Sequence, residues 1–251
     1  MKVLGVHDGH TATVKLMKMR KISIIMPAFN EERTIEKTVD KVEKIKIKNY
    51  LKELIIVDDC SKDNTSIIIK KLKMKYKNIK SFTHPVNQGK GATIRTALKN
   101  VTGEIAIIQD ADAEYNPEEI ADLIKFREKN KLDVVYGSRA LNKNNSYSYI
   151  SYLLGNVFLN KITNLLYSTR LTDMETCYKL VPSKILKQIN IVSNGFDIEP
   201  EITAKIARLG YKIAEFPISY YPRSKEEGKK IRWKDGLAAV WTLFYWRFRK
   251  F

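Results

Sequence analysis

The stretch IIQDADAEYNP, residues 107–117, decides how this chain can fold. It completes an apolar run and then places two carboxylates, Asp110 and Asp112, one residue apart. Side chains at positions i and i+2 of an extended chain point to the same side. Two anions so close repel each other unless they share a proton or hold a hard cation such as Mg²⁺ or Mn²⁺, which completes its coordination with water and substrate phosphates. The alternative is a turn whose acids cap the helix that begins at NPEE.

On both sides of this stretch, apolar runs alternate with segments of helical periodicity. Buried strands are predicted at 22–27, 53–59, 78–84, 104–110 and 133–139, and helices at 31–46, 63–76, 89–101 and 116–130. Glu31 and Glu32 would open the first helix at the positive end of its dipole, and Asp63 or Asn64 would cap the second. Continuous apolar strands that alternate with helices predict an α/β fold with a mostly parallel sheet and helices on both faces.

After residue 139 this regular alternation is lost. A polar loop leads to predicted helices at 150–168 and 199–210, a strand at 212–223 and a charged loop at 225–236. The ligand site of a parallel sheet lies beyond the carboxyl ends of its strands. Polar residues stand at four predicted strand ends, so we expect one site that gathers residues 27–31, 58–59, 110–112 and 137–139.

The chain is strongly basic, with 45 Lys and Arg against 28 Asp and Glu and a formal net charge of +17. Such an excess indicates an anionic partner (nucleic acid, a membrane surface or a phosphorylated ligand) or only a lysine-rich composition with solvated helix faces. Cys60 and Cys177 form neither a metal motif nor a disulfide framework. The longest uncharged run, 144–160, carries Asn, Ser and Gly throughout, so we expect no membrane-spanning helix.

Residues 1–18 stand apart from the rest of the sequence. His7, Asp8 and His10 could be drawn as a metal cluster, but short motifs often match by chance. We expect either a strand–turn extension or sequence upstream of a start at Met19, and assign it no function.

Six segments, taken together and in order, resemble the inverting GT-A glycosyltransferases of family 2, and most of all the polyprenyl-phosphate (dolichol-phosphate) sugar transferases. They are PAFNE (27–31), VDDCSKDNT (57–65), NQGKGATIRTAL (87–98), DADAEYNP (110–117), VYGSR (135–139) and DMETCYK (173–179). The resemblance covers about residues 21–225. It implies a GT-A fold, with a nucleotide-binding, Rossmann-like sheet, in a catalytic domain over 19–225. A basic amphipathic segment over 226–251 would follow that domain.

The resemblance also implies which residues bind the nucleotide sugar. They are Pro27, Ala28, Phe29, Glu31, Asp58, Asp59, Lys90, Gln109, Asp110 and Ala111. Phe29 could cover a base face or simply pack in the core, and Lys90 could contact a phosphate or a base or merely follow a glycine-rich helix start. Cys60 stands where the family usually has glycine and Ala113 where it usually has leucine, and neither change removes a polar ligand.

The resemblance assigns Asp110 and Asp112 to the metal, with Gln109 and Glu114 as further candidates. Arg139 and Arg223 would contact phosphates, because a guanidinium binds phosphate through two donors and keeps its charge. The basic segment would continue through Lys225, Lys229 and Lys230.

The acceptor determines whether a general base is needed. A sugar hydroxyl must lose a proton to a base, whereas a phosphate is already ionised and needs cations instead, with Arg139, Arg170, Lys179 and Arg223 as candidates. Asp173 could be that base or could position a cation, and the sequence leaves both roles open.

The C-terminal sequence GLAAVWTLFYWRFRKF suggests an amphipathic helix. Its apolar stripe at helical spacing comprises Trp233, Leu237, Val240 or Trp241, Phe244 and Phe248, followed by Arg247, Arg249 and Lys250. Aromatic and basic residues together suit a helix that lies in a membrane interface, with a Tyr-rich helix over 147–167 as a second contact. The alternative is a helix docked on the domain core.

We therefore predict a cytoplasmic enzyme, peripheral at the inner face of the cell membrane. It would transfer a sugar from GDP-mannose or a UDP-hexose to a polyprenyl or dolichyl phosphate, with inversion and metal assistance and without a nucleic-acid partner. Its catalytic residues would be Asp112, Arg139, Asp173 and Arg223. Two alternatives stay open: a transferase for a saccharide hydroxyl with Asp173 as base, and a basic nucleic-acid-binding protein. A nucleotidyltransferase fits less well, because PAFNEE lacks a glycine-rich basic signature.

Overall fold

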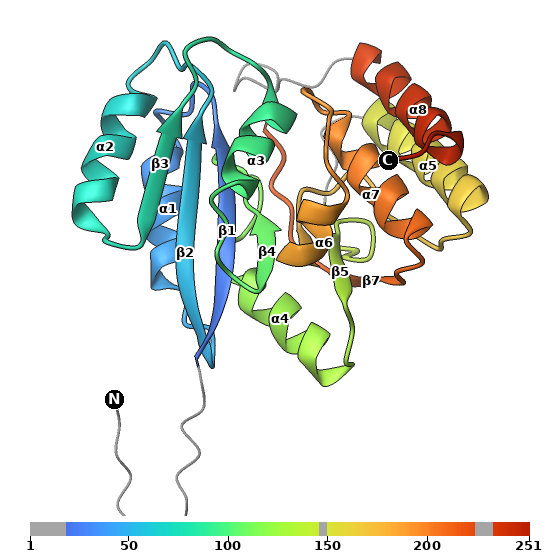
Figure 1. The fold of residues 1–251 in the computed structure, drawn as a ribbon, viewed down its shortest axis with the longest axis horizontal. Coiled ribbons are helices and arrows are strands. Elements are labelled where there is room, and N and C mark those ends of the chain that lie inside the picture. Colours follow the sequence, from blue (N-terminus) through green and yellow to red (C-terminus); the bar gives the residue numbers. More distant parts are fainter. Residues whose placement is uncertain (1–18, 146–149, 224–232) are drawn as a thin grey trace, which may run out of the picture.

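The computed structural model describes residues 19–145, 150–223 and 233–251 (Figure 1). The extension 1–18 and Lys225, Lys229 and Lys230 lie outside these described residues. A seven-stranded sheet with the strand order β3-β2-β1-β4-β6-β5-β7 runs through the molecule. The α/β class predicted from the sequence is confirmed.

The N-terminal half forms the parallel part of the sheet. Its strands are β1 (Arg20–Ala28), β2 (Tyr50–Asp58), β3 (Ile79–Thr83) and β4 (Ile105–Ile108). Two helices, α1 (Ile35–Lys44) and α2 (Thr65–Lys75), pack against each other, and α3 (Lys90–Leu98) packs on β1 and β2. In Figure 1, α1 lies behind the sheet and α3 in front of it. Helices on both faces explain why β4 is buried along its whole length.

The start of the first helix differs from the prediction. The helix begins at Ile35 with Thr34 at the N-cap, so Glu31 and Glu32 precede it and do not open it. Glu31 therefore belongs to the loop beyond β1, at the edge where the parallel strands end. At α2, Asn64 occupies the N-cap position, while Asp63 Oδ1 accepts a hydrogen bond from the Thr65 N–H at 3.0 Å.

The C-terminal half contains a strand that the sequence did not predict. β6 (Lys179–Pro182) lies between β4 and β5 (Val134–Ser138) and runs antiparallel to both. This reversal places the residues just before β6 at the edge where β4 and β5 end. β7 (Ile213–Pro217) pairs parallel with β5 and is shorter than the predicted strand 212–223. Helix α4 (Glu119–Lys129) packs against β5. Helix α6 (Ser183–Gln188), which the sequence did not predict, follows β6.

Three helices of the C-terminal half, α5 (Ile150–Tyr167), α7 (Ile198–Arg208) and α8 (Trp233–Phe248), pack together as a group. α8 packs on α5 and α7, at the right of Figure 1. Leu243 and Trp246 form part of its buried face. The opposite face exposes Leu237, Trp241, Phe244 and Phe248, which we call the α8 stripe. The helix is thus docked on the domain, and most of the apolar stripe predicted from the sequence faces outward. The Trp233 side chain is outside the described part. Among the described helices, none has the length and apolar character needed to cross a membrane.

Candidate active site

A cavity of about 650 Å³ opens where β1, β2 and β4 end. The residues predicted for the site that line it are Pro27, Ala28, Phe29, Glu31, Asp59, Lys90, Asp110, Ala111, Asp112, Glu114, Arg139 and Arg223. The strands bring these residues together because the parallel register aligns Ala28 with Asp58 and Ile25 with Ile108. The convergence expected from the strand ends is therefore present.

Two predicted nucleotide-sugar residues lie behind the described cavity wall. Asp58 Oδ1 accepts hydrogen bonds from the Ser61 N–H at 3.0 Å and the Ser61 hydroxyl at 2.5 Å, and Oδ2 accepts one from the Ser66 hydroxyl. Gln109 is fully buried, accepts a hydrogen bond from the Tyr178 hydroxyl and donates one to the Asp110 carbonyl at 3.0 Å. Both side chains hold the turns that carry the site.

Asp59 organises the glycine-rich segment before α3. Its carboxylate accepts hydrogen bonds from the backbone N–H groups of Gln88 at 2.9 Å and Gly89 at 2.7 Å. Gly89 has a φ of +94°, and a Cβ at Gly91 would lie 2.2 Å from the Ser193 carbonyl oxygen. Glycine is thus needed at both positions, for the turn and for the close approach of the loop before α7.

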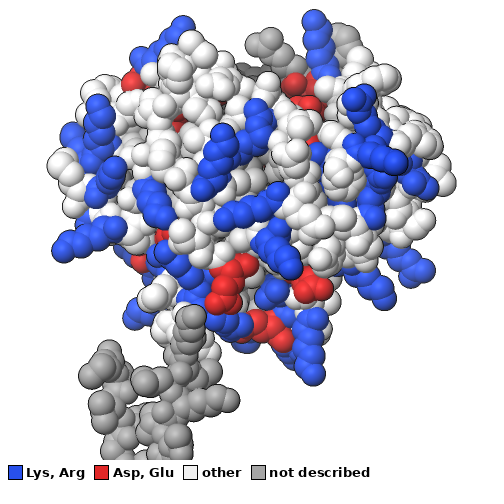
Figure 2. Space-filling model, in the orientation of Figure 1, with Lys and Arg blue, Asp and Glu red and all other residues white. Residues whose placement is uncertain are grey.

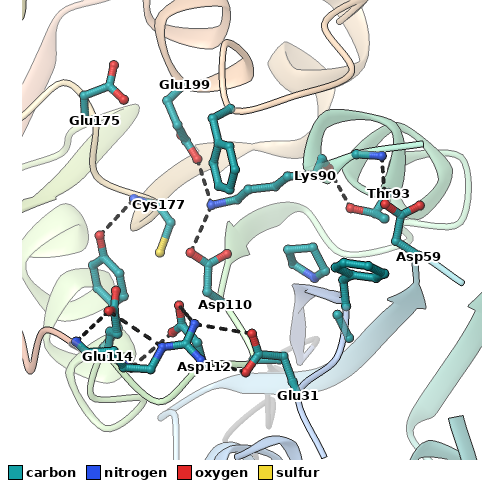
Figure 3. A pocket seen from close by; sticks show the side chains of 18 of the residues that line it. Glu31, Asp59, Lys90, Thr93, Asp110, Asp112, Glu114, Glu175, Cys177 and Glu199 are labelled. Carbon is teal, nitrogen blue, oxygen red and sulfur yellow. Dashed lines mark hydrogen bonds and ion pairs between the residues drawn. The ribbon is translucent and has the colours of Figure 1, made fainter. Parts of the chain in front are cut away.

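Each acid of the DAD motif is paired with a different basic side chain (Figure 3). Lys90 Nζ lies 2.9 Å from Asp110 Oδ2 and 3.2 Å from Glu199 Oε1. Arg223 contacts Asp112 Oδ2 at 3.2 Å and Glu31 Oε2 at 3.0 Å. Acidic and basic side chains therefore alternate in the cavity. An acid could exchange its basic partner for a bound cation, and a base could exchange its acidic partner for a bound phosphate.

The acidic pair provides oxygen ligands of the kind that Mg²⁺ and Mn²⁺ prefer. Burial and the charges of Asp110 and Glu114 raise the pKa of Asp112 to about 7, against the opposing charge of Arg223. A divalent cation would relieve this crowding of carboxylates. Within the described residues, no group of three or more Asp, Glu, His or Cys side chains is arranged to hold a metal ion. Two carboxylates fit an ion that keeps water and substrate phosphates in its shell.

Arg139 and Asp173 form a two-point ion pair beside the cavity. Arg139 Nε and Nη2 donate to the two Asp173 carboxylate oxygens at 2.7 Å each, and the Arg139 backbone N–H donates at 2.9 Å. Asp173 is fully buried and is not part of the described cavity lining, whereas Arg139 does line it. Burial alone would raise the pKa of Asp173, but the Arg139 guanidinium and its hydrogen bonds hold that pKa below its ordinary value.

The family model for glycosyl transferase family 2 matches residues 23–190. The chain belongs to glycosyl transferase family 2. The resemblance read from the sequence is confirmed, and the protein is a glycosyltransferase. It is 30% identical over 226 residues to a dolichyl-phosphate beta-glucosyltransferase of Trichomonas vaginalis, covering 84% of this chain and 68% of that protein. An uncharacterised protein of Methanocaldococcus jannaschii is also 30% identical, over 78% of this chain and 86% of its own length.

Solved structures confirm the GT-A fold of this glycosyltransferase. Glucosyl-3-phosphoglycerate synthase from Mycobacterium tuberculosis, crystallised with Mn²⁺ and UDP-glucose, has a TM-score of 0.66 at 19% identity, covering 91% of this chain and 79% of that one. Residues 1–349 of TarS from S. aureus, in complex with UDP, have a TM-score of 0.60 at 20% identity. Here the match covers 90% of this chain and 65% of the TarS chain, so this chain spans less than two thirds of that relative.

Several cavity residues of this glycosyltransferase were not identified from the sequence. Glu199 contacts Lys90 and lies 2.8 Å from Lys179 Nζ, yet in the sequence it looks like an ordinary acid of a helix start. Phe196 lines the cavity from a segment that no motif marked, and Tyr220 lines it from the segment that carries the predicted Arg223. Glu175 also lines it and lies inside the matched DMETCYK segment, which was the one signal that could have identified it.

Proposed function

We propose that this glycosyltransferase transfers a hexose from a nucleoside diphosphate sugar to a polyprenyl or dolichyl phosphate with inversion, and that UDP-glucose is the first donor to test. The observation that carries the proposal is the Arg139–Asp173 pair. The acid that a hydroxyl acceptor would need as a base is fully buried and holds an arginine, while that arginine reaches the cavity. The name of the glucosyltransferase relative supports the same acceptor class and glucose as the sugar.

The donor fits the cavity with its nucleotide at the β1 and β2 ends. Pro27, Ala28 and Phe29 form that wall, and Asp59 lies beside it. The diphosphate then reaches Asp110 and Asp112, where Mg²⁺ or Mn²⁺ would be held and would neutralise charge on the leaving diphosphate. Lys90 and Arg223 would exchange carboxylate partners for phosphate oxygens and help to retain the leaving group.

The acceptor phosphate needs orientation and charge compensation rather than proton removal. Its oxygen attacks the anomeric carbon from the side opposite the diphosphate, the bond to the leaving oxygen breaks, and the configuration inverts. A guanidinium has five N–H donors, so Arg139 retains donors for a phosphate while two of its nitrogens remain with Asp173. Asp173 would therefore position Arg139.

The outer face of α5 and α8 supports docking on a lipid surface, where the acceptor is anchored. Trp241 and Phe248 of the α8 stripe are 70% and 78% exposed, and Leu154, Phe158 and Leu165 of α5 are exposed as well. Arg247, Arg249 and Lys250 stand beside them in the sequence and are exposed. Aromatic side chains next to cations suit the interface of an anionic bilayer.

The charge distribution favours this reading over nucleic-acid binding. On the face shown in Figure 2, Lys and Arg side chains are scattered over the surface and do not form a single track. The acids that a duplex would repel gather inside the cavity instead. Salt-sensitive DNA binding without sugar transfer would contradict the proposal.

Labelled donors with a lipid acceptor test the proposal. The purified protein is incubated with UDP-glucose, UDP-GlcNAc or GDP-mannose, a polyprenyl phosphate and Mn²⁺, and the lipid is extracted. We expect label in the organic phase from UDP-glucose, lost on chelation and about 100-fold lower in Asp112→Asn. Transfer only to saccharide acceptors, or unchanged transfer in Asp112→Asn, would overturn it.

A further inference from the structure

We propose that Glu175 hydrogen-bonds a hydroxyl group of the transferred sugar and thereby contributes to the choice of donor. This inference rests on the proposed function, because it assumes that the cavity binds a nucleotide sugar. Glu175 precedes the antiparallel strand β6, whose direction carries the residue to the cavity.

The Glu175 carboxyl has an unmet hydrogen-bonding requirement. Its Oε1 is buried and makes no hydrogen bond with the residues that the structure describes. The nearby cations have other partners: Arg139 holds Asp173, and Lys179 Nζ donates to the Met174 carbonyl at 2.7 Å and lies 2.8 Å from Glu199 Oε2. A buried acceptor without a partner costs free energy, which a ligand hydroxyl can recover.

The position of Glu175 fits the sugar part of the donor. In Figure 3, Glu175 and Asp59 lie on opposite sides of Asp110 and Lys90. A donor with its nucleotide near Asp59 and its diphosphate at Asp110 therefore extends its sugar toward Glu175.

The chemistry of Glu175 suits a hydroxyl better than a phosphate. A carboxylate repels an anionic phosphate, whereas a hydroxyl can both donate and accept. Burial, and less strongly the charge of Glu199, raise the pKa of Glu175 to about 7, despite the opposing charge of Lys179. Near neutral pH the carboxyl can thus accept from a hydroxyl or donate to it.

Calorimetric titration with UDP and with UDP-glucose in Mn²⁺ separates sugar contacts from nucleotide contacts. For Glu175→Ala we expect the Kd of UDP-glucose to rise about 10-fold while the Kd of UDP changes less than about 2-fold. Glu175→Gln keeps a hydrogen-bonding group of similar size, so its Kd for UDP-glucose should lie between those of the wild type and Glu175→Ala. Phe29→Ala is the matched contrast, because loss of a nucleotide contact should weaken both ligands together.

Deoxy analogues of UDP-glucose complete the test on the wild-type protein. One analogue, lacking the hydroxyl that Glu175 contacts, should bind about 10-fold more weakly to the wild type than UDP-glucose does, whereas Glu175→Ala should bind that analogue and UDP-glucose equally well. Equal losses for UDP and UDP-glucose in Glu175→Ala, or no loss for any deoxy analogue in the wild type, would overturn the inference. If the wild type binds neither UDP-glucose nor GDP-mannose, the proposed function itself fails.

Discussion

Among single residues, Cys60 stands where the resemblance to the family led us to expect glycine. Its φ is 62°, in the left-handed region, at the turn after β2. An L-residue with a side chain pays about 1–2 kcal/mol in this conformation, whereas glycine adopts it freely. The family glycine is therefore explained by the backbone, and Cys60 is a tolerated strain.

Cys60→Gly should raise the free energy of unfolding by about 0.5–1 kcal/mol, because relief of the left-handed conformation outweighs the extra freedom of glycine in the unfolded chain. Chemical denaturation measures the change. Lys62→Gly, in the same turn but without a positive φ, is the control and should lower stability. A destabilised Cys60→Gly would mean that the weak contact of Cys60 Sγ with the Pro85 carbonyl at 3.5 Å dominates.

Substitution of Asp173 distinguishes a general base from a residue that positions Arg139. If it acts through Arg139, Asp173→Asn should lower kcat/KM for the lipid phosphate about 10- to 100-fold, mainly through KM. Adding Asp173→Asn to Arg139→Gln should then have little further effect, because both changes disable one unit. Initial rates over a range of acceptor concentrations give kcat and KM for each variant. A collapse of kcat with unchanged KM, additive with Arg139→Gln, would identify Asp173 as a base.

At the scale of secondary-structure elements, one buried carboxylate on β2 links that strand to three other segments. Glu53 on β2 accepts hydrogen bonds from the Ser23 hydroxyl on β1 at 2.5 Å and from the Thr102 N–H before β4 at 2.6 Å. Lys80 Nζ on β3 lies 3.0 Å from its other oxygen. Burial alone would raise the pKa of Glu53, but these hydrogen bonds hold that pKa well below its ordinary value.

Glu53 should therefore stabilise the sheet most above pH 4.5. A carboxyl whose pKa is depressed in the folded state contributes stability above its unfolded pKa, about 4.3, and loses it as the pH falls toward the folded pKa. Glu53→Gln should be clearly less stable than the wild type at pH 7, and the gap should narrow as the pH falls below about 4.5. Denaturation curves between pH 3 and 7 check this, with the exposed Glu36→Gln as control. A gap that widens in acid would refute the assignment.

At the scale of the whole molecule, α8 has two apolar faces with different consequences. Leu243 and Trp246 pack inward against α5 and α7, and Arg208 Nη1 donates to the Trp246 carbonyl at 2.7 Å. The α8 stripe points away from the domain. The inner face thus stabilises the fold, and the outer face is available to a lipid surface.

Replacing Trp241 and Phe248 together with Ser should reduce binding to vesicles of phosphatidylcholine and phosphatidylserine by about 10-fold or more, because burying a large apolar side chain contributes about 1.5–3 kcal/mol. Co-sedimentation of the protein with the vesicles measures this binding. Binding of the nucleotide should not change, since the stripe is not part of the cavity lining. Leu243→Ala is the matched control: it should cost about 2–5 kcal/mol of stability without a specific loss of lipid binding. Vesicle binding that survives loss of the stripe would place the lipid surface elsewhere.

Patterns that act over a few residues carried the sequence predictions. The alternation of apolar strands and helices predicted the parallel half of the sheet, because burial on both faces leaves continuous apolar runs. The acids at the ends of β1 and β4 were placed at the cavity for the same reason, since parallel strands end at one edge. The six motifs together indicated the family, which the comparisons confirmed.

The tertiary structure alone decided where the remaining side chains point. Antiparallel β6 joins segments far apart in the chain, and only that pairing carries Glu175 to the cavity while Asp173 turns back onto Arg139. Asp58 and Gln109 stand at the right strand ends, yet they bond to neighbouring turns, because a side-chain direction depends on partners that no local pattern specifies. The sequence by itself determined the elements other than β6 and α6, and the motifs that mark the site. Contacts between distant segments determined which of those residues line the cavity.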